Sequence, residues 1–177
     1  ELSAGVIPIG QQRWGDWRKM ADCPPNTWAV GYSQRVEADQ GKKKDDTALN
    51  SVKLVCAGVN RSEPTTVISS HEGWFGTWAS SPVCGAGQWL KAGRIRIEPR
   101  QGGDKDDTAA NDVNFQCTDG TELTAGNGAP WGTWNEYQSC PDDTVVCGVE
   151  VRVESKQGDK DDTAMNGLRV RCCELVN

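Results

Sequence analysis

The sequence is poor in histidine and in most bulky apolar residues: it has one histidine, two methionines, two phenylalanines and two tyrosines in 177 residues. With His71 as the only histidine and an even number of cysteines that suits disulfides, a Ser/His/Asp or Cys/His catalytic group is nearly excluded. No window approaches the run of about 18 apolar residues that spans a membrane, and none is typical of a signal peptide. We therefore expect no membrane insertion.

Positive charge is also scarce, since the formal net charge is −6 and the pI is near 4.8. A protein that neutralises phosphates needs a basic stripe. The one dense basic run, Lys42 to Lys44, leads directly into Asp45 and Asp46, which is typical of a solvated loop. We expect no nucleic-acid partner.

The eight cysteines indicate a disulfide framework, which persists outside the cytosol. Zinc is disfavoured because there is no Cys-x-x-Cys pair and only one histidine, so we expect no metal and no other cofactor. The chain begins at Glu1, which suggests a removed leader, and Asn60 heads a glycosylation sequon, Asn-Arg-Ser. These features predict a secreted, extracellular protein.

One acidic motif occurs three times, as "KKKDDTALN" at 42–50, "GDKDDTAAN" at 103–111 and "GDKDDTAMN" at 158–166. Other residues recur at nearly the same offsets. They are Trp17, Trp78 and Trp134; Cys23, Cys84 and Cys140; Glu37, Glu98 and Glu154; Asn50, Asn111 and Asn166; and Cys56, Cys117 and Cys172. The repeat predicts a single domain over 1–177 made of three units, at about 5–60, 61–120 and 121–177.

Each unit is predicted to be β throughout. Segments such as "AGRIRIEP", "VEVRVES" and "SVKLVC" alternate apolar and polar residues with the period of a strand that has one buried face. No stretch shows a convincing helical stripe, and each unit has residues for roughly four short strands. Three sheets that must each bury one face are expected to pack around a shared pseudo-threefold axis.

The repeat also restricts the disulfide pairing. If the units are equivalent, the bridges are Cys23–Cys56, Cys84–Cys117 and Cys140–Cys172, which leaves Cys147 with Cys173. The alternative of Cys140–Cys173 with Cys147–Cys172 stays open. On the chain-entropy model, closing a loop of about 33 residues is worth roughly 3 to 4 kcal/mol, so the molecule is expected to be durable.

The tryptophans have a structural and a carbohydrate interpretation. Trp17, Trp78 and Trp134 recur at one place in each unit, so we favour the interpretation that they fill a symmetric core or brace each disulfide. Trp28 and Trp89 correspond to Val145 in the third unit. A position that accepts valine is expected to be buried.

The acidic loops have three possible roles. Asp, Thr and Asn side chains can lock an irregular loop through hydrogen bonds to nearby backbone, which is the favoured interpretation. Alternatively, they contact sugar hydroxyls or bind calcium, although the ligand spacing of an EF-hand is absent. Adjacent aspartates do not by themselves form the carboxylate pair of a glycosidase, so no catalytic residue is assigned. The candidate glycan-binding residues are Asp45, Asp46, Asp106, Asp107, Asp161 and Asp162.

Taken together, the Trp-Gly segments, the following cysteine, the Val/Ile-x-Val/Ile-Glu strand and the triple "DDTAxN" resemble the vitelline membrane outer layer protein I family over nearly the whole chain. The resemblance implies a β-prism of the first type, with three four-stranded Greek-key sheets, in secreted, disulfide-bonded proteins of the egg envelope. "WFGTW" departs from the pattern by an inserted Phe75, and the first loop departs by its lysine run. Jacalin-type lectins share that fold, which makes sugar binding an analogy only.

The expected function is therefore that of a non-enzymatic structural protein of an extracellular coat, matrix or secretion. Its expected partners are extracellular glycoproteins or polysaccharide. The alternative is a lectin-like module for oligosaccharides of the N-acetylglucosamine or chitin type. An enzyme that processes glycans with paired carboxylates is the third and weakest possibility.

Overall fold

The structure is a computed structural model that describes residues 3–12, 15–37, 49–61, 63–98, 110–154 and 165–176. Within these ranges every regular element is a β-strand. The same ranges contain no helix that is long and apolar enough to cross a bilayer.

The strands form three antiparallel sheets, here called A, B and C. Sheet A has the order β1 (Ser3–Gln11), β14 (Met165–Glu174), β13 (Thr144–Val153) and β2 (Asp16–Trp17), and β3 (Ala21–Asp22) also pairs with β13. Sheet B has the order β6 (Thr66–Ser69), β5 (Leu49–Ala57), β4 (Trp28–Val36) and β7 (Thr77–Trp78). Sheet C has the order β10 (Glu122–Thr124), β9 (Ala110–Cys117), β8 (Leu90–Ile97) and β11 (Thr133–Trp134), and β12 (Gln138–Ser139) also pairs with β8.

The four-strand paths of sheets B and C are Greek keys, because the fourth strand along the chain returns to lie beside the first. Sheet A has the same spatial order, but the two chain ends fall between β14 and β1. A sheet combines the long hairpin of one repeat with short strands of the next repeat. In sheet A the N-terminal β1 and β2 flank the C-terminal hairpin β13–β14, so the two ends of the chain close the ring. The predicted all-β fold with three Greek-key sheets is confirmed.

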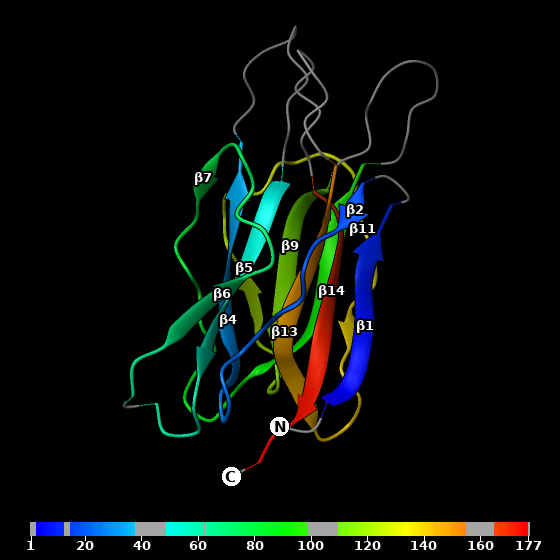
Figure 1. Ribbon diagram of the computed structural model, residues 1–177. Coiled ribbons are helices and arrows are strands. Elements are labelled where there is room, and N and C mark those ends of the chain that lie inside the picture. Colours follow the sequence, from blue (N-terminus) through cyan, green and yellow to red (C-terminus); the bar gives the residue numbers. More distant parts are fainter. Residues whose placement is uncertain are drawn as a thin grey trace, which may run out of the picture.

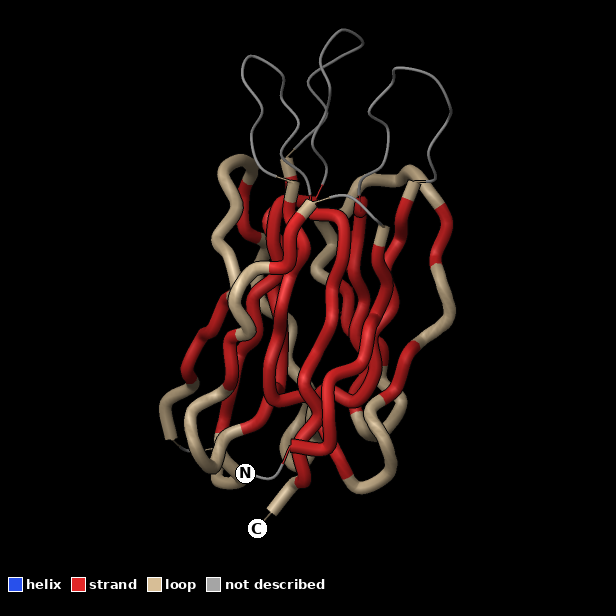
Figure 2. The backbone as a smooth tube through the Cα atoms, turned by 45° about the vertical axis from the view of Figure 1, so that its right-hand side comes forward, coloured by secondary structure: helices blue, strands red, loops and turns tan. Residues whose placement is uncertain are grey.

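The sheets surround one core, and their long strands run along the same axis (Figures 1 and 2). The main apolar cluster takes buried residues from all three sheets, among them Leu54, Ile95 and Leu168. Tyr32 lies in this core, where its ring packs on Phe115 and its hydroxyl donates to the carbonyl of Val113 at 2.7 Å. The shared core explains why one face of every long strand is apolar.

We call the places where β4, β8 and β13 end and β5, β9 and β14 begin the hairpin openings. A second, smaller apolar cluster lies at the opposite end of the sheets. Trp28 and Trp89 are 1% and 3% exposed and meet edge to face, with ring centroids 5.7 Å apart. Val145 belongs to the same cluster. The prediction that this repeated position is buried is confirmed.

Three of the four disulfides join neighbouring sheets. The structure contains Cys23–Cys56, Cys84–Cys117, Cys140–Cys172 and Cys147–Cys173, so the pairing drawn from the repeat holds over its alternative. In the first three bridges, the N–H of the first cysteine donates to a strand of one sheet and its sulfur bonds to the next sheet. Cys84, for example, donates to the Val30 carbonyl of sheet B at 2.7 Å and is bridged to Cys117 of sheet C. Every seam of the prism therefore carries one covalent cross-link.

Each Trp-Gly segment crosses the end of a hairpin strand, and the crossing residue is a glycine. Gly15, Gly76 and Gly132 have left-handed φ values of 87°, 98° and 95°. A Cβ at these glycines would lie within 2.5 to 2.7 Å of the backbone of Val153, Val36 and Ile97, respectively. The glycine carbonyls accept hydrogen bonds from Nε of Arg152, Arg35 and Arg96 at 3.0 to 3.1 Å. We call each such contact a crossing clamp.

The prediction that the recurrent tryptophans fill the core is wrong, and the alternative that they brace the disulfides stays a prediction. Trp17, Trp78 and Trp134 are half-buried and belong to neither apolar cluster. Instead, a cation lies over each indole ring. Arg169 lies 4.1 Å from the ring centroid of Trp17, Lys53 4.3 Å from that of Trp78, and Arg94 4.6 Å from that of Trp134. The tryptophans therefore secure the crossing segments to the outer side of the sheets through cation–π contacts.

The crossing clamps predict an unequal response of two glycines to alanine. Gly132 and Gly120 have similar φ values, 95° and 90°, but a Cβ on Gly120 meets nothing within 4 Å. Both substitutions put an alanine in a left-handed backbone conformation, which costs free energy. Only Gly132→Ala also forces its Cβ against the backbone of Ile97. We expect Gly132→Ala to lower the free energy of unfolding by about 1 to 3 kcal/mol more than Gly120→Ala. Urea unfolding of both variants measures this difference, and equal losses would contradict the clamp.

Candidate functional site

The openings of the three long hairpins, β4–β5, β8–β9 and β13–β14, lie at the same end of the prism (Figure 1). The described residues that flank the openings are Glu37 and Leu49, Glu98 and Ala110, and Glu154 and Met165. The six aspartates proposed from the sequence, Asp45, Asp46, Asp106, Asp107, Asp161 and Asp162, lie outside the described residues. Their assignment to glycan binding or to a loop lock stays a prediction.

The asparagine that ends each acidic motif is buried near the start of the second strand of its hairpin. Asn50, Asn111 and Asn166 are 1%, 2% and 0% exposed. The carbonyl of Asn166 accepts from the N–H of Gln12 at 2.7 Å, and that of Asn111 accepts from Ala129 at 2.9 Å. These residues therefore hold the segment that leads to a crossing clamp.

The sequon residue Asn60 is exposed and follows the end of β5. It lies in a bend whose closing contact is the Glu63 N–H donating to the Asn60 carbonyl at 3.4 Å. An exposed position of this kind is accessible to a glycan, and glycosylation of Asn60 stays a prediction.

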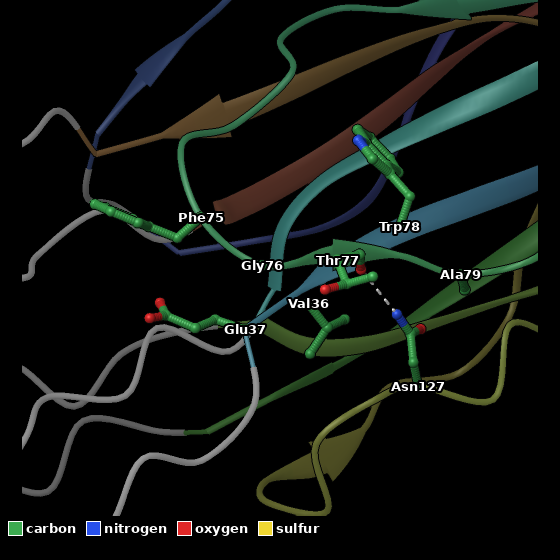
Figure 3. A pocket seen from close by; sticks show the side chains of 8 residues that line it. All are labelled: Val36, Glu37, Phe75, Gly76, Thr77, Trp78, Ala79 and Asn127. Atoms are coloured by element: carbon green, nitrogen blue, oxygen red, sulfur yellow. Dashed lines mark hydrogen bonds between the residues drawn. The ribbon is translucent and has the colours of Figure 1, made fainter.

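A groove lies where β7 passes the end of β4, beside the hairpin openings. Its volume is about 600 Å³, and it is lined by Val36, Glu37, Phe75, Gly76, Thr77, Trp78, Ala79 and Asn127. Figure 3 shows Phe75 and Glu37 projecting in the same direction on either side of Gly76. An aromatic ring, a carboxylate and apolar side chains therefore face one hollow, which we call the β7 groove.

The residues that line the β7 groove differ from those at the corresponding positions of the other two repeats. Phe75 is inserted between Trp74 and Gly76, whereas "WGDW" and "WGTW" have no residue there. Asn127 stands four residues before Trp131, and the corresponding residues before Trp14 and Trp74 are Gly10 and Ser70. No other corner combines an extra aromatic residue with an amide side chain.

A buried polar network supports the β7 groove from behind. Gln34 is 0% exposed and donates through Nε2 to Asp112 at 2.8 Å and to Asn127 at 3.0 Å. Asn127 in turn donates to the carbonyls of Gln34 and Thr77, both at 3.3 Å. Burial raises the pKa of Asp112 above its ordinary value, against the opposing effect of its bond from Gln34. The network joins sheets B and C and holds Asn127 in one orientation.

A second cluster lies just before the same crossing clamp, around the only histidine. The Nδ1 atom of His71 accepts from the N–H of Gly73 at 3.0 Å, and its ring lies 4.6 Å from that of Trp74. Arg18 lies over the same indole, 5.7 Å from its centroid. Burial, followed by the charge of Arg18, lowers the pKa of His71. These contacts position Trp74, which is 41% exposed.

Sequence reasoning missed the arginines of the crossing clamps and the Gln34 network for different reasons. The arginines were visible as a pattern, because "QRVE", "RIRIE" and "VRVE" share an arginine two residues before the glutamate. Gln34, by contrast, corresponds to Ile95 and Val151, so the repeat contains no signal for it. Across the described ranges, no three His, Cys, Asp or Glu side chains are grouped to hold a metal.

Solved structures with the same arrangement of sheets define the class of fold. Calystegia sepium agglutinin matches with a TM-score of 0.59 over 96% of each chain, at 9% identity. AcmJRL, a mannose-binding jacalin-related lectin from Ananas comosus, matches with 0.58 over 96% of this chain and 97% of that one, at 10% identity. The artocarpin–mannopentose complex also matches with 0.58, at 11% identity, over 96% and 99% of the two chains. The protein has the β-prism fold of jacalin-related lectins.

Sequence comparison is more specific than the fold. The profile of the family described as Vitelline membrane outer layer protein I (VOMI) matches residues 8–175. The vitelline membrane outer layer protein 1 homolog of Mus musculus is 40% identical over 161 residues, which are 90% of this chain and 78% of the mouse protein. The Homo sapiens homolog is 41% identical over 162 residues, with the same two shares. The chain belongs to the vitelline membrane outer layer protein I family, as its motifs predict.

His71 predicts a component of stability that depends on pH. Because the folded state lowers the pKa of His71 below its ordinary 6.5, this component is complete above 6.5 and is lost as the pH falls through the folded-state pKa. His71→Asn keeps an acceptor for the Gly73 N–H but does not titrate. Between about pH 7.5 and about pH 5, we expect the wild-type free energy of unfolding to decline relative to that of His71→Asn. Parallel pH profiles of the two proteins would show that His71 plays no such part.

Proposed function

We propose that the protein is a non-enzymatic structural component of an extracellular coat, matrix or secretion, and that it associates there with the glycans of glycoproteins or with polysaccharide. The observation that carries this proposal is the covalent cross-link at every seam of the prism. A protein that must keep its shape outside the cell, without chaperones, gains most from such links because they restrict its unfolded state.

Family membership supports a coat or matrix setting. The family profile covers most of the chain, and its description refers to the outer layer of a vitelline membrane. Such a layer is an assembly of extracellular proteins, so a durable prism with a disulfide between each pair of neighbouring sheets is a suitable building unit.

A lectin-like role is the second candidate, and the fold favours it. Solved structures with this fold include proteins described as mannose-binding and complexes with mannose oligosaccharides. Fold does not determine function, but the β7 groove adds a hollow with an aromatic ring and a carboxylate among its lining residues. In this role Asp45, Asp46, Asp106, Asp107, Asp161 and Asp162 accept hydrogen bonds from sugar hydroxyls.

The structural part of the proposal predicts local loosening when a seam bridge is removed. Cys84→Ala with Cys117→Ala opens the seam between sheets B and C, whereas Cys147→Ala with Cys173→Ala removes a bridge inside sheet A. We expect the first pair to lower the free energy of unfolding by about 2 to 5 kcal/mol. It should also speed amide exchange at residue 84 and at Tyr32, which donate to Val30 and Pro82 across that edge. Unchanged exchange at both amides would contradict the role of the bridge.

The glycan part of the proposal is tested by a glycan array with the native, oxidised protein. The array includes mannose and chitin-type oligosaccharides and is run with and without calcium. We expect saturable binding to one class of neutral glycan that the free sugar competes away. A blank array with folded protein would leave the coat role and remove the lectin role.

A further inference from the structure

We propose that the β7 groove is the primary saccharide site of this protein, and that it takes one pyranose ring of a neutral oligosaccharide against Phe75. The inference rests on the proposed glycan association and deepens it by assigning a place and a contact residue. It also departs from threefold symmetry, because it assigns binding to one corner rather than to three.

A crossing clamp can form without a residue at the position of Phe75. The crossing clamp at Gly76 has the same left-handed glycine and the same arginine bond as the clamps at Gly15 and Gly132. Those two clamps form without an inserted residue, so the insertion is not required to build one. Phe75 is half-buried, lies outside both apolar clusters and lines the groove. A partly exposed aromatic ring on the wall of a hollow indicates a contact surface for a ligand.

The size and lining of the groove suit a sugar ring. A volume of about 600 Å³ falls within the range of small-molecule sites, roughly 300 to 1,000 Å³. The partly exposed ring of Phe75 offers apolar contact to the C–H face of a pyranose, and the carboxylate of Glu37 is an acceptor for hydroxyl groups. Aromatic and carboxylate groups together match a ligand that has one apolar face and a polar rim.

Charge selects a neutral ligand over an anionic one. Glu37 lines the groove, and the protein has a formal net charge of −6. A sulfated or phosphorylated glycan would be repelled at long range by the net negative charge. A neutral hexose or N-acetylhexosamine has no such penalty.

Addition of a peptide strand is disfavoured at the same place. β7 is the edge strand of sheet B, which makes it a candidate for pairing with an extended partner chain. However, the carbonyl of Thr77 already accepts from Nδ2 of Asn127 at 3.3 Å, and the Gln34 network holds Asn127 in place. Because this carbonyl is already occupied, we expect the ligand to be contacted by side chains rather than by the backbone of β7.

The pseudo-symmetry of the chain supplies matched variants for the test. Deleting Phe75 converts "WFGTW" to the "WGTW" of residues 131–134, a sequence that already folds in this protein. Phe75→Ala keeps the chain length and removes only the ring. Trp131→Ala is the control, because Trp131 is 42% exposed at a corner without the insertion. Calorimetric titrations use a mannose trimer and an N-acetylglucosamine trimer, and melting curves verify the fold of each variant.

We expect wild type to bind one of the two trimers, both Phe75 variants to bind about tenfold more weakly or worse, and Trp131→Ala to stay within about twofold of wild type. If wild type binds and the Phe75 variants bind equally well, the assignment to the β7 groove is wrong while the glycan association stands. If Trp131→Ala loses as much as Phe75→Ala, the corners share the binding and the single-site inference fails. If wild type binds neither trimer, both the inference and the lectin role are overturned.

Discussion

The crossing of a glycine over the end of a hairpin strand is the contact on which the prism depends. A sheet of this size cannot bury its apolar face alone, so each sheet needs its neighbours. The chain meets this need by sending a segment of each repeat onto the edge of the adjoining sheet, which is possible only where Cβ is absent. Once the glycine is seated, its carbonyl accepts from an arginine, the tryptophan beyond it lies under a cation, and the following cysteine reaches the next sheet. One backbone constraint therefore places a hydrogen bond, a cation–π contact and a disulfide at every seam.

This arrangement separates the ends of the molecule by role. The end near the termini contains the small, buried tryptophan cluster and the bridge between Cys147 and Cys173. The opposite end contains the hairpin openings, the exposed Trp74 and the β7 groove. Binding surfaces on a rigid scaffold concentrate in such loop regions. The threefold repeat builds the scaffold, and the binding site that we propose lies where the chain departs from threefold symmetry.

The architecture could be predicted from the sequence because each strand pattern and each cysteine position occurs three times. A single strand of alternating residues is ambiguous, whereas three in register with matched cysteines define the sheets and their bridges. The same reasoning failed for Trp17, Trp78 and Trp134, since recurrence shows that a position matters but does not show which face it lies on. It also failed for Gln34 and Asn127, because these residues occur in one repeat only and meet across 93 residues of sequence. Asymmetric features are invisible to an argument from symmetry, and the β7 groove is such a feature.

The most direct test of the account is an NMR titration that follows the indole N–H resonances of the eight tryptophans while a neutral oligosaccharide trimer is added. Each corner of the prism has its own indole signals, so the spectrum reports where the sugar lies without any mutation. The account predicts saturable shifts for Trp74 and Trp78, which border Phe75, and none for Trp131 and Trp134. Equal shifts at these two corners, or no shift at any tryptophan, would contradict it.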